Sequence, residues 1–82
     1  MSQRTVKSPL PGTFYRRPDP DTEPYVTEGD EVAPGTTVGL VEIMKRFHEV
    51  RSDAAGTIDR FLVDNEEAVD VGQDILSLRD SE

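Results

Sequence analysis

The stretch Val41-Glu42-Ile43-Met44-Lys45-Arg46-Phe47-His48-Glu49-Val50 decides the fold of this 82-residue chain. It is apolar up to Ile43, becomes polar and basic at its centre, and returns to an apolar residue at Val50. The β-branched residues at both ends favour strands over a helix. Its centre contains no Gly, Pro or Asn, the residues that normally form a tight turn. We therefore predict a hairpin whose tip is not explained by ordinary turn chemistry.

Outward from this hairpin, turn signals recur along the whole chain. Between them lie short runs rich in Val, Ile, Leu, Thr and aromatic residues, at 12–15, 37–43, 56–63 and 75–78. Short strands at this spacing are typical of an all-β sandwich or barrel, and no window has the periodicity of a long helix. The small size and the 34% hydrophobic content predict one domain over residues 1–82. We expect its ends to fray at 1–5 and 79–82.

The two halves of the chain resemble each other. Residues 8–14 match residues 52–58 at an offset of 44. Later positions match at an offset of 37, in the pairs 25–26 with 62–63, 32–35 with 69–72, 38 with 75 and 41 with 78. An ordered series of this kind indicates a repeat rather than a chance likeness of short units. Two such halves can pack as a pseudo-twofold sandwich in which each covers the apolar face of the other.

The change of offset places seven extra residues in the first half, between Phe14 and Tyr25. Three prolines and three acids lie within seven of the residues there, 18–24. Because Pro cannot donate to a strand ladder, this insertion predicts a protruding, semi-rigid loop. Surface insertions are tolerated at little energetic cost, so the insertion alone does not establish a role.

Composition excludes several classes of function. Seventeen acids against nine bases give a net charge of −8, which argues against nucleic acid or an anionic membrane as a partner. No apolar run is long enough to cross a bilayer or to serve as a secretory signal. The lack of Cys excludes disulfides, thiolate catalysis and cysteine zinc sites. These features fit the cytoplasm.

Little in the chain can perform catalysis. The single histidine, His48, has no recognisable nucleophile beside it and too few companions for a metal site. Of the two lysines, Lys7 and Lys45, the second falls at the junction of the repeat. A Lys beside an Arg at a turn is most often solvated charge. A hairpin at this junction would nevertheless supply the exposed amine on a rigid support that covalent modification requires.

Glu42-Ile43-Met44-Lys45 resembles the biotin-attachment motif, most often Glu-Ala-Met-Lys followed by Met or Leu. Residues 8–16 resemble the entry strand of the biotin carboxyl carrier proteins of bacterial-type acetyl-CoA carboxylase. The insertion corresponds to the "thumb" loop of these carriers: Arg17, Pro18, Asp19, Pro20, Asp21, Thr22, Glu23 and Pro24. The resemblance extends from about Thr5 to Leu78.

This resemblance implies a flattened β-sandwich of two four-stranded antiparallel sheets with quasi-twofold symmetry. It implies that a biotin protein ligase reads Glu42, Ile43, Met44 and Arg46 and attaches biotin to Lys45, with the thumb near the cofactor. Biotin carboxylase would then carboxylate the biotin with ATP and bicarbonate. A carboxyltransferase would pass the carboxyl group to acetyl-CoA, forming malonyl-CoA for fatty acid synthesis. The carrier itself would contribute no catalytic residue and no metal.

Three positions depart from the family pattern. Ile43 stands where the family prefers Ala, Arg46 where it prefers Met or Leu, and Arg17 where relatives often have a smaller residue. Because the ligase reads residues around its target, the first two could weaken modification. Two alternatives therefore stay open: a structural or regulatory paralogue without biotin, and a lipoyl carrier, which usually has Asp-Lys-Ala here. The chain is expected to be either a free-standing carrier or an excised domain.

Overall fold

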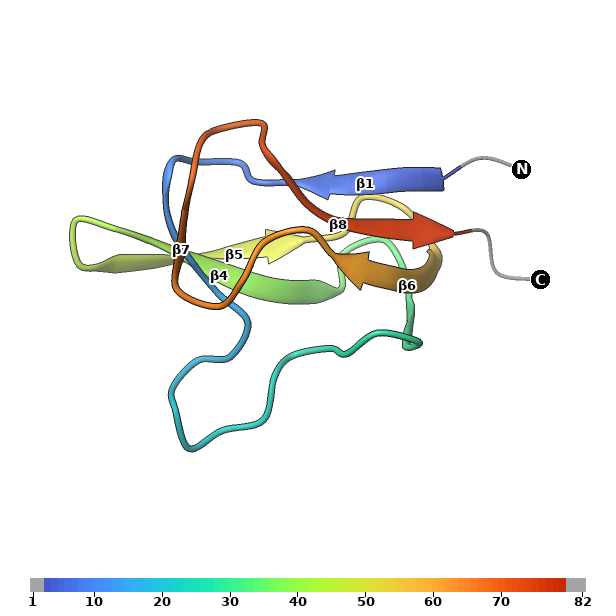
Figure 1. Ribbon diagram of the computed structural model, residues 1–82, viewed down its shortest axis with the longest axis horizontal. Coiled ribbons are helices and arrows are strands. Elements are labelled where there is room, and N and C mark those ends of the chain that lie inside the picture. Colours follow the sequence, from blue (N-terminus) through green and yellow to red (C-terminus); the bar gives the residue numbers. More distant parts are fainter. Residues whose placement is uncertain (1–2, 80–82) are drawn as a thin grey trace.

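The computed structural model describes residues 3–79, which fold into eight antiparallel strands arranged in two sheets (Figure 1). The order is β1-β8-β6-β3 in one sheet and β5-β4-β2-β7 in the other. Within residues 3–79 there is no helix, and hence none that could cross a membrane. The predicted all-β sandwich of two four-stranded sheets is confirmed. The strands are β1 (Gln3–Lys7), β2 (Gly12–Tyr15), β3 (Glu31–Val32), β4 (Thr37–Ile43), β5 (Arg46–Arg51), β6 (Gly56–Phe61), β7 (Glu67–Val69) and β8 (Asp74–Arg79).

The quasi-twofold symmetry inferred from the repeat is present in the strand order. Exchanging β1 with β5, β2 with β6, β3 with β7 and β4 with β8 converts the order of one sheet into that of the other. The hydrogen bonds between strands and turns repeat in the same way. The Gly35 amide donates to the Ser52 carbonyl at 2.7 Å, and the Gly72 amide donates to the Ser8 carbonyl at 2.8 Å. The two halves therefore share one local geometry.

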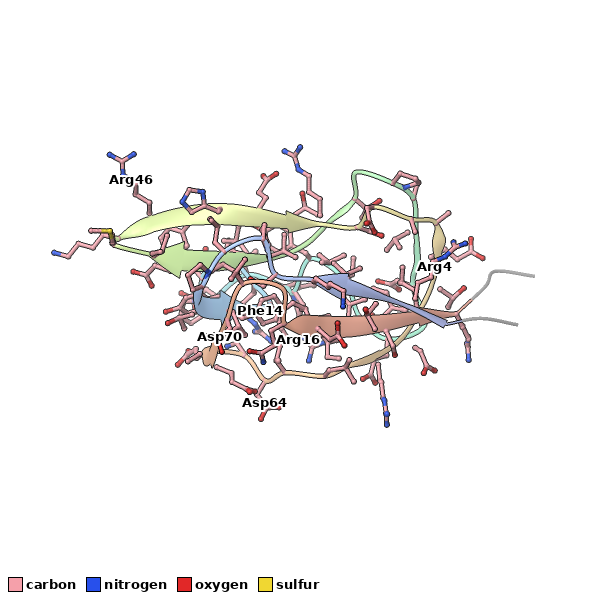
Figure 2. All side chains as sticks on the ribbon, turned by 90° about the horizontal axis from the view of Figure 1, so that it is seen from above. Arg4, Phe14, Arg16, Arg46, Asp64 and Asp70 are labelled. Carbon is pink, nitrogen blue, oxygen red and sulfur yellow. The ribbon has the colours of Figure 1, made fainter. Side chains whose placement is uncertain are left out.

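The core lies between the two sheets and draws on both halves at equivalent positions. Each fully buried aliphatic or aromatic side chain contributes about 1.5–3 kcal/mol when it leaves water. Figure 2 shows Phe14, which is completely buried, between the two layers. Neither half could bury this surface alone, so each depends on the other. The equivalent buried pairs are Val6 and Val50, Phe14 and Ile58, Val26 and Val63, Val32 and Val69, Val38 and Ile75, and Val41 and Leu78.

Two glycines allow β2 and β4 to approach closely near the start of the hairpin. A Cβ atom on Gly39 would lie 2.5 Å from the Phe14 ring, and one on Gly12 would lie 2.3 Å from the Glu42 carbonyl oxygen. Contacts this short do not occur, so any side chain at either position would push the strands apart. The close approach fixes β4, and with it the root of the hairpin, against β2.

Residues 3–5 and Arg79, which the sequence placed in frayed ends, are paired instead. Strand β1 runs antiparallel to β8, with Gln3 opposite Arg79 and Thr5 opposite Ser77. Lys7 Nζ and Thr5 Oγ1 both donate to an Asp74 carboxylate oxygen, at 2.5 and 3.0 Å. Strand β1 lies at the edge of its sheet, and its largely polar sequence gives a weak hydrophobic signal. The remaining predicted positions, 1–2 and 80–82, lie outside the described residues.

Removal of either hydroxyl from the equivalent serines Ser8 and Ser52 should destabilise the fold. Each is 2% exposed, and its Oγ donates at 2.5 Å to the carbonyl two residues ahead. We expect Ser8→Ala and Ser52→Ala each to lower the free energy of unfolding by about 1–2 kcal/mol, measured by urea denaturation. Ser77→Ala is the control, because that buried hydroxyl makes only a 3.4 Å contact with Asp59. An equal loss of unfolding free energy in all three variants would show that the hydrogen bonds of Ser8 and Ser52 are not the cause.

Candidate functional site

The tip of the hairpin is a two-residue turn with an unusual backbone. Strand β4 ends at Ile43 and β5 begins at Arg46, and these two residues are cross-strand partners. Met44 and Lys45 form the turn, with φ angles of 53° and 65°. Two positive φ angles define a type I′ turn, whose twist matches that of the flanking strands but which normally contains Asn-Gly. For residues with a Cβ atom this conformation costs about 1–2 kcal/mol each.

This turn displays the Lys45 amine at the far end of the molecule. Met44 is 87% exposed, Lys45 is also exposed, and within residues 3–79 Lys45 makes no hydrogen bond or ion pair. In Figure 1 the hairpin extends beyond the other strands, at the end opposite the two termini, and Figure 2 shows Arg46 pointing outward there. Lys7, by contrast, is ion-paired with Asp74. Lys45 is thus a free amine on a firmly paired support.

The root of the hairpin carries a polar and aromatic cluster on the outer face of its sheet. Glu42 lies opposite Phe47 on β5 and opposite Thr13 on β2. The Tyr15 hydroxyl donates to Glu42 Oε1 at 3.1 Å, and its ring meets the Phe47 ring edge-on, with the centroids 6.0 Å apart. The hydrogen bond to the Glu42 carboxylate raises the pKa of Tyr15, and desolvation adds to that shift.

Residues 17–24 form a loop that leaves the sandwich between β2 and β3 (Figure 1). Its base is closed by the Tyr25 amide, which donates to the Arg16 carbonyl at 3.0 Å. Its tip is ordered by the Asp19 carboxylate, which accepts hydrogen bonds from the Asp21 amide at 2.9 Å and the Thr22 hydroxyl at 2.8 Å. The proline-rich insertion is therefore a structured loop, in keeping with its composition.

A pocket of about 290 Å³ lies between the base of this loop and the turn before β7. Its wall includes Tyr15, whose hydroxyl also donates to Glu42 at the hairpin root. No hydrogen bond or ion pair joins Lys45 to the loop within the described part of the chain. The pocket is lined by Tyr15, Arg17, Pro18, Asp19, Pro20, Asn65 and Glu66.

Arg16 connects the loop to the second half of the chain. Its amide donates to the Asn65 side-chain oxygen at 2.8 Å, and its guanidinium lies 3.9 Å above the centre of the Phe61 ring. Its Nε is buried without a hydrogen-bond partner in residues 3–79. Local sequence patterns assign no role to Arg16, Tyr15 or Phe47. For Tyr15 the alternation of side chains along the strand is informative, because it places Tyr15 on the same face of the sheet as Thr13 and on the opposite face from Phe14.

The sequence-predicted residues thus divide into two groups. Glu42, Ile43, Met44, Lys45 and Arg46 form the continuous hairpin end. Residues 17–24 form a separate loop, and a pocket lined by part of it is also lined by Tyr15, which hydrogen-bonds Glu42. His48 is exposed on β5. Within residues 3–79, no three His, Asp or Glu side chains gather as metal ligands would. The arrangement can present an amine to another protein.

Comparison with known proteins identifies the family. Residues 4–78 match the biotin/lipoyl attachment family described as "Biotin-requiring enzyme", and the chain belongs to it. It is 38% identical over 74 residues to the biotin carboxyl carrier protein of acetyl-CoA carboxylase of Nostoc, covering 90% of this chain and 41% of that protein. The Haemophilus influenzae protein of the same name is 33% identical over 76 residues, covering 93% and 49%. The chain spans less than half the length of these curated relatives.

Solved structures show the same fold. A single-chain, multi-domain long-chain acyl-CoA carboxylase matches with a TM-score of 0.77 and 21% identity, over 98% of this chain and 7% of that one. The urea carboxylase of Kluyveromyces lactis matches with a TM-score of 0.77 and 23% identity, over 96% and 6%. At this level of identity the likeness concerns the sandwich alone.

Replacing Met44 with a residue that tolerates positive φ should stabilise the hairpin. Asn adopts the left-handed conformation more readily than Met, so Met44→Asn should raise the free energy of unfolding by about 0.5–1 kcal/mol in urea denaturation. Met44→Ala removes the same side chain but retains the unfavourable φ, and it should give no such gain. A loss of stability in Met44→Asn would show that the Met44 side chain itself supports the turn.

Proposed function

We propose that this chain is a biotin carrier of acetyl-CoA carboxylase, with Lys45 as the attachment residue and no catalytic activity of its own. The observation that carries the proposal is the free, exposed Lys45 amine at the tip of a projecting hairpin. The relatives named as biotin carboxyl carrier proteins of acetyl-CoA carboxylase support the choice of biotin over lipoate. The partners are a biotin protein ligase, a biotin carboxylase and a carboxyltransferase, and the proposed location is the cytoplasm.

The residues present fit a biotin linked through an amide. Forming that bond needs a primary amine that is accessible and not held in an ion pair, and Lys45 meets both conditions while Lys7 does not. The cofactor, when bound, supplies a ring nitrogen that accepts a carboxyl group. The hairpin supplies reach, because a tip only two residues wide can enter the active site of another protein. Tethering raises the effective concentration of the bound group at each partner site.

The surrounding residues have distinct proposed roles. Glu42, Ile43, Met44 and Arg46 form the recognition context that a ligase reads around Lys45. The loop at 17–24 is the proposed neighbour of the attached group. In support, its base borders a pocket that begins at Tyr15, beside the hairpin root. Residues 1–82 act as one carrier domain in this proposal.

Co-expression with a biotin protein ligase and free biotin tests the attachment residue directly. Intact mass spectrometry should show one biotin-sized increment on the wild-type protein. The chain offers a matched pair of variants, because it has only two lysines: Lys45→Arg should abolish the increment, and Lys7→Arg should retain it. Both changes keep the positive charge, so a difference between the two variants reports which lysine amine accepts the biotin.

Other results would contradict the proposal in different ways. No increment on a folded wild-type protein, with a ligase that modifies a known substrate in parallel, would favour a paralogue without biotin. Modification by a lipoyl ligase with lipoate, and not by the biotin ligase, would favour a lipoyl carrier. An increment that persists in Lys45→Arg and disappears in Lys7→Arg would place the attachment on the other lysine.

A further inference from the structure

We propose that Tyr15 is a positioning residue whose hydroxyl fixes the Glu42 carboxylate beside Phe47. These three side chains together would form a surface that the enzyme acylating Lys45 binds. The inference rests on the proposed function, since it needs Lys45 to be acylated. It adds to that function a docking surface with a definite chemistry, an anchored carboxylate next to an exposed aromatic ring.

The geometry holds Glu42 firmly and leaves part of it unused. Glu42 is the single acidic residue of β4 and lies on the outer face of the sheet. One carboxylate oxygen, Oε1, accepts the Tyr15 hydroxyl at 3.1 Å. Within residues 3–79, no Lys or Arg pairs with Glu42, and no hydrogen bond reaches its second oxygen. A carboxylate fixed in this way, with one free oxygen, is prepared to accept a cation from another molecule.

The apolar part of this surface is separate from the core. Phe47 is 55% exposed on the edge strand β5, and its ring contacts Tyr15. Leu40 is only 8% exposed, yet it does not belong to the core cluster, and its cross-strand partner is Tyr15. Tyr15, Leu40 and Phe47 thus line the outer face of the sheet next to Glu42. Exposed aromatic residues beside a fixed charge are typical of protein contact surfaces.

Charge identifies the kind of partner. The chain carries a net charge of −8, so one more unpaired carboxylate does not stabilise the fold. A partner with a Lys or Arg aimed at Glu42 and an apolar side chain for Phe47 would match the surface. An enzyme that acylates Lys45 must bind the hairpin, and Glu42 and Phe47 are cross-strand partners at the root of that hairpin.

The competing explanation is that the hydrogen bond only ties β2 to β4. A double-mutant cycle separates the two possibilities, because a residue that acts through Glu42 loses its effect when Glu42 can no longer be read. The variants are Tyr15→Phe, Glu42→Gln and the double variant. Tyr25→Phe is the matched control, since the other tyrosine has no side-chain hydrogen bond in the described residues and no part in the proposed surface.

Steady-state acylation of the unmodified domain by a purified biotin protein ligase, with biotin and ATP, gives KM and kcat for each variant. We expect Tyr15→Phe to raise KM about 3–10-fold with kcat within about twofold, since a hydrogen bond to a charged group is lost. Glu42→Gln should raise KM further, and adding Tyr15→Phe to it should change KM by less than about twofold. Tyr25→Phe should match the wild type. Direct binding of the ligase to the Lys45→Arg domain, which cannot be acylated, should weaken by the same factor when Tyr15→Phe is added.

Each contrary result has a definite meaning. An unchanged KM and unchanged binding in Tyr15→Phe, with the wild type acylated normally, would overturn the inference and leave the proposed function intact. The same would follow if Tyr15→Phe had an equal effect with and without Glu42, accompanied by a lower melting temperature, because the hydrogen bond would then be purely structural. Failure of the wild-type domain to be acylated would overturn both.

Discussion

The burial of the apolar face of each sheet against the other sheet is the constraint on which the structure depends, and each sheet takes two strands from each half of the chain. A chain of this size without cysteine has no other large source of stability. Because the equivalent buried residues come in pairs, the two halves contribute similar surfaces, and neither can be removed without exposing the other. The symmetric strand order places these paired residues at equivalent positions in the two sheets.

The same symmetry determines where the hairpin lies. The pairing of β4 with β5 has its counterpart in the pairing of β8 with β1, so the hairpin and the two chain ends lie at opposite ends of the sandwich (Figure 1). The link between the halves can be short only if β4 and β5 are neighbours in one sheet. A tip of two residues satisfies that condition. The position of Lys45 is thus a consequence of the fold, and its chemistry is a consequence of the position.

Much of this arrangement could be predicted because it depends on local pattern. The runs at 12–15 and 37–43 coincide with β2 and β4, since alternation and β-branched residues give a clear signal there. Strand β1 gives no clear signal because its sequence is largely polar and lies at a sheet edge, and the strand that begins at Gly56 ends at Phe61 rather than at residue 63. The roles of Tyr15 and Arg16 depend on cross-strand and loop partners distant in sequence, which no local pattern shows.

The turn at Met44 and Lys45 is where local preference and fold disagree. Sequence reasoning could see that turn residues were missing but not that both positions adopt positive φ. Such conflicts concentrate at functional positions, where another requirement outweighs stability. The two departures from the family motif, Ile43 and Arg46, are cross-strand partners at the base of this turn. The β-branched Ile43 favours the extended conformation that leads into the turn, and Arg46 is exposed and points outward, so both residues are compatible with the hairpin.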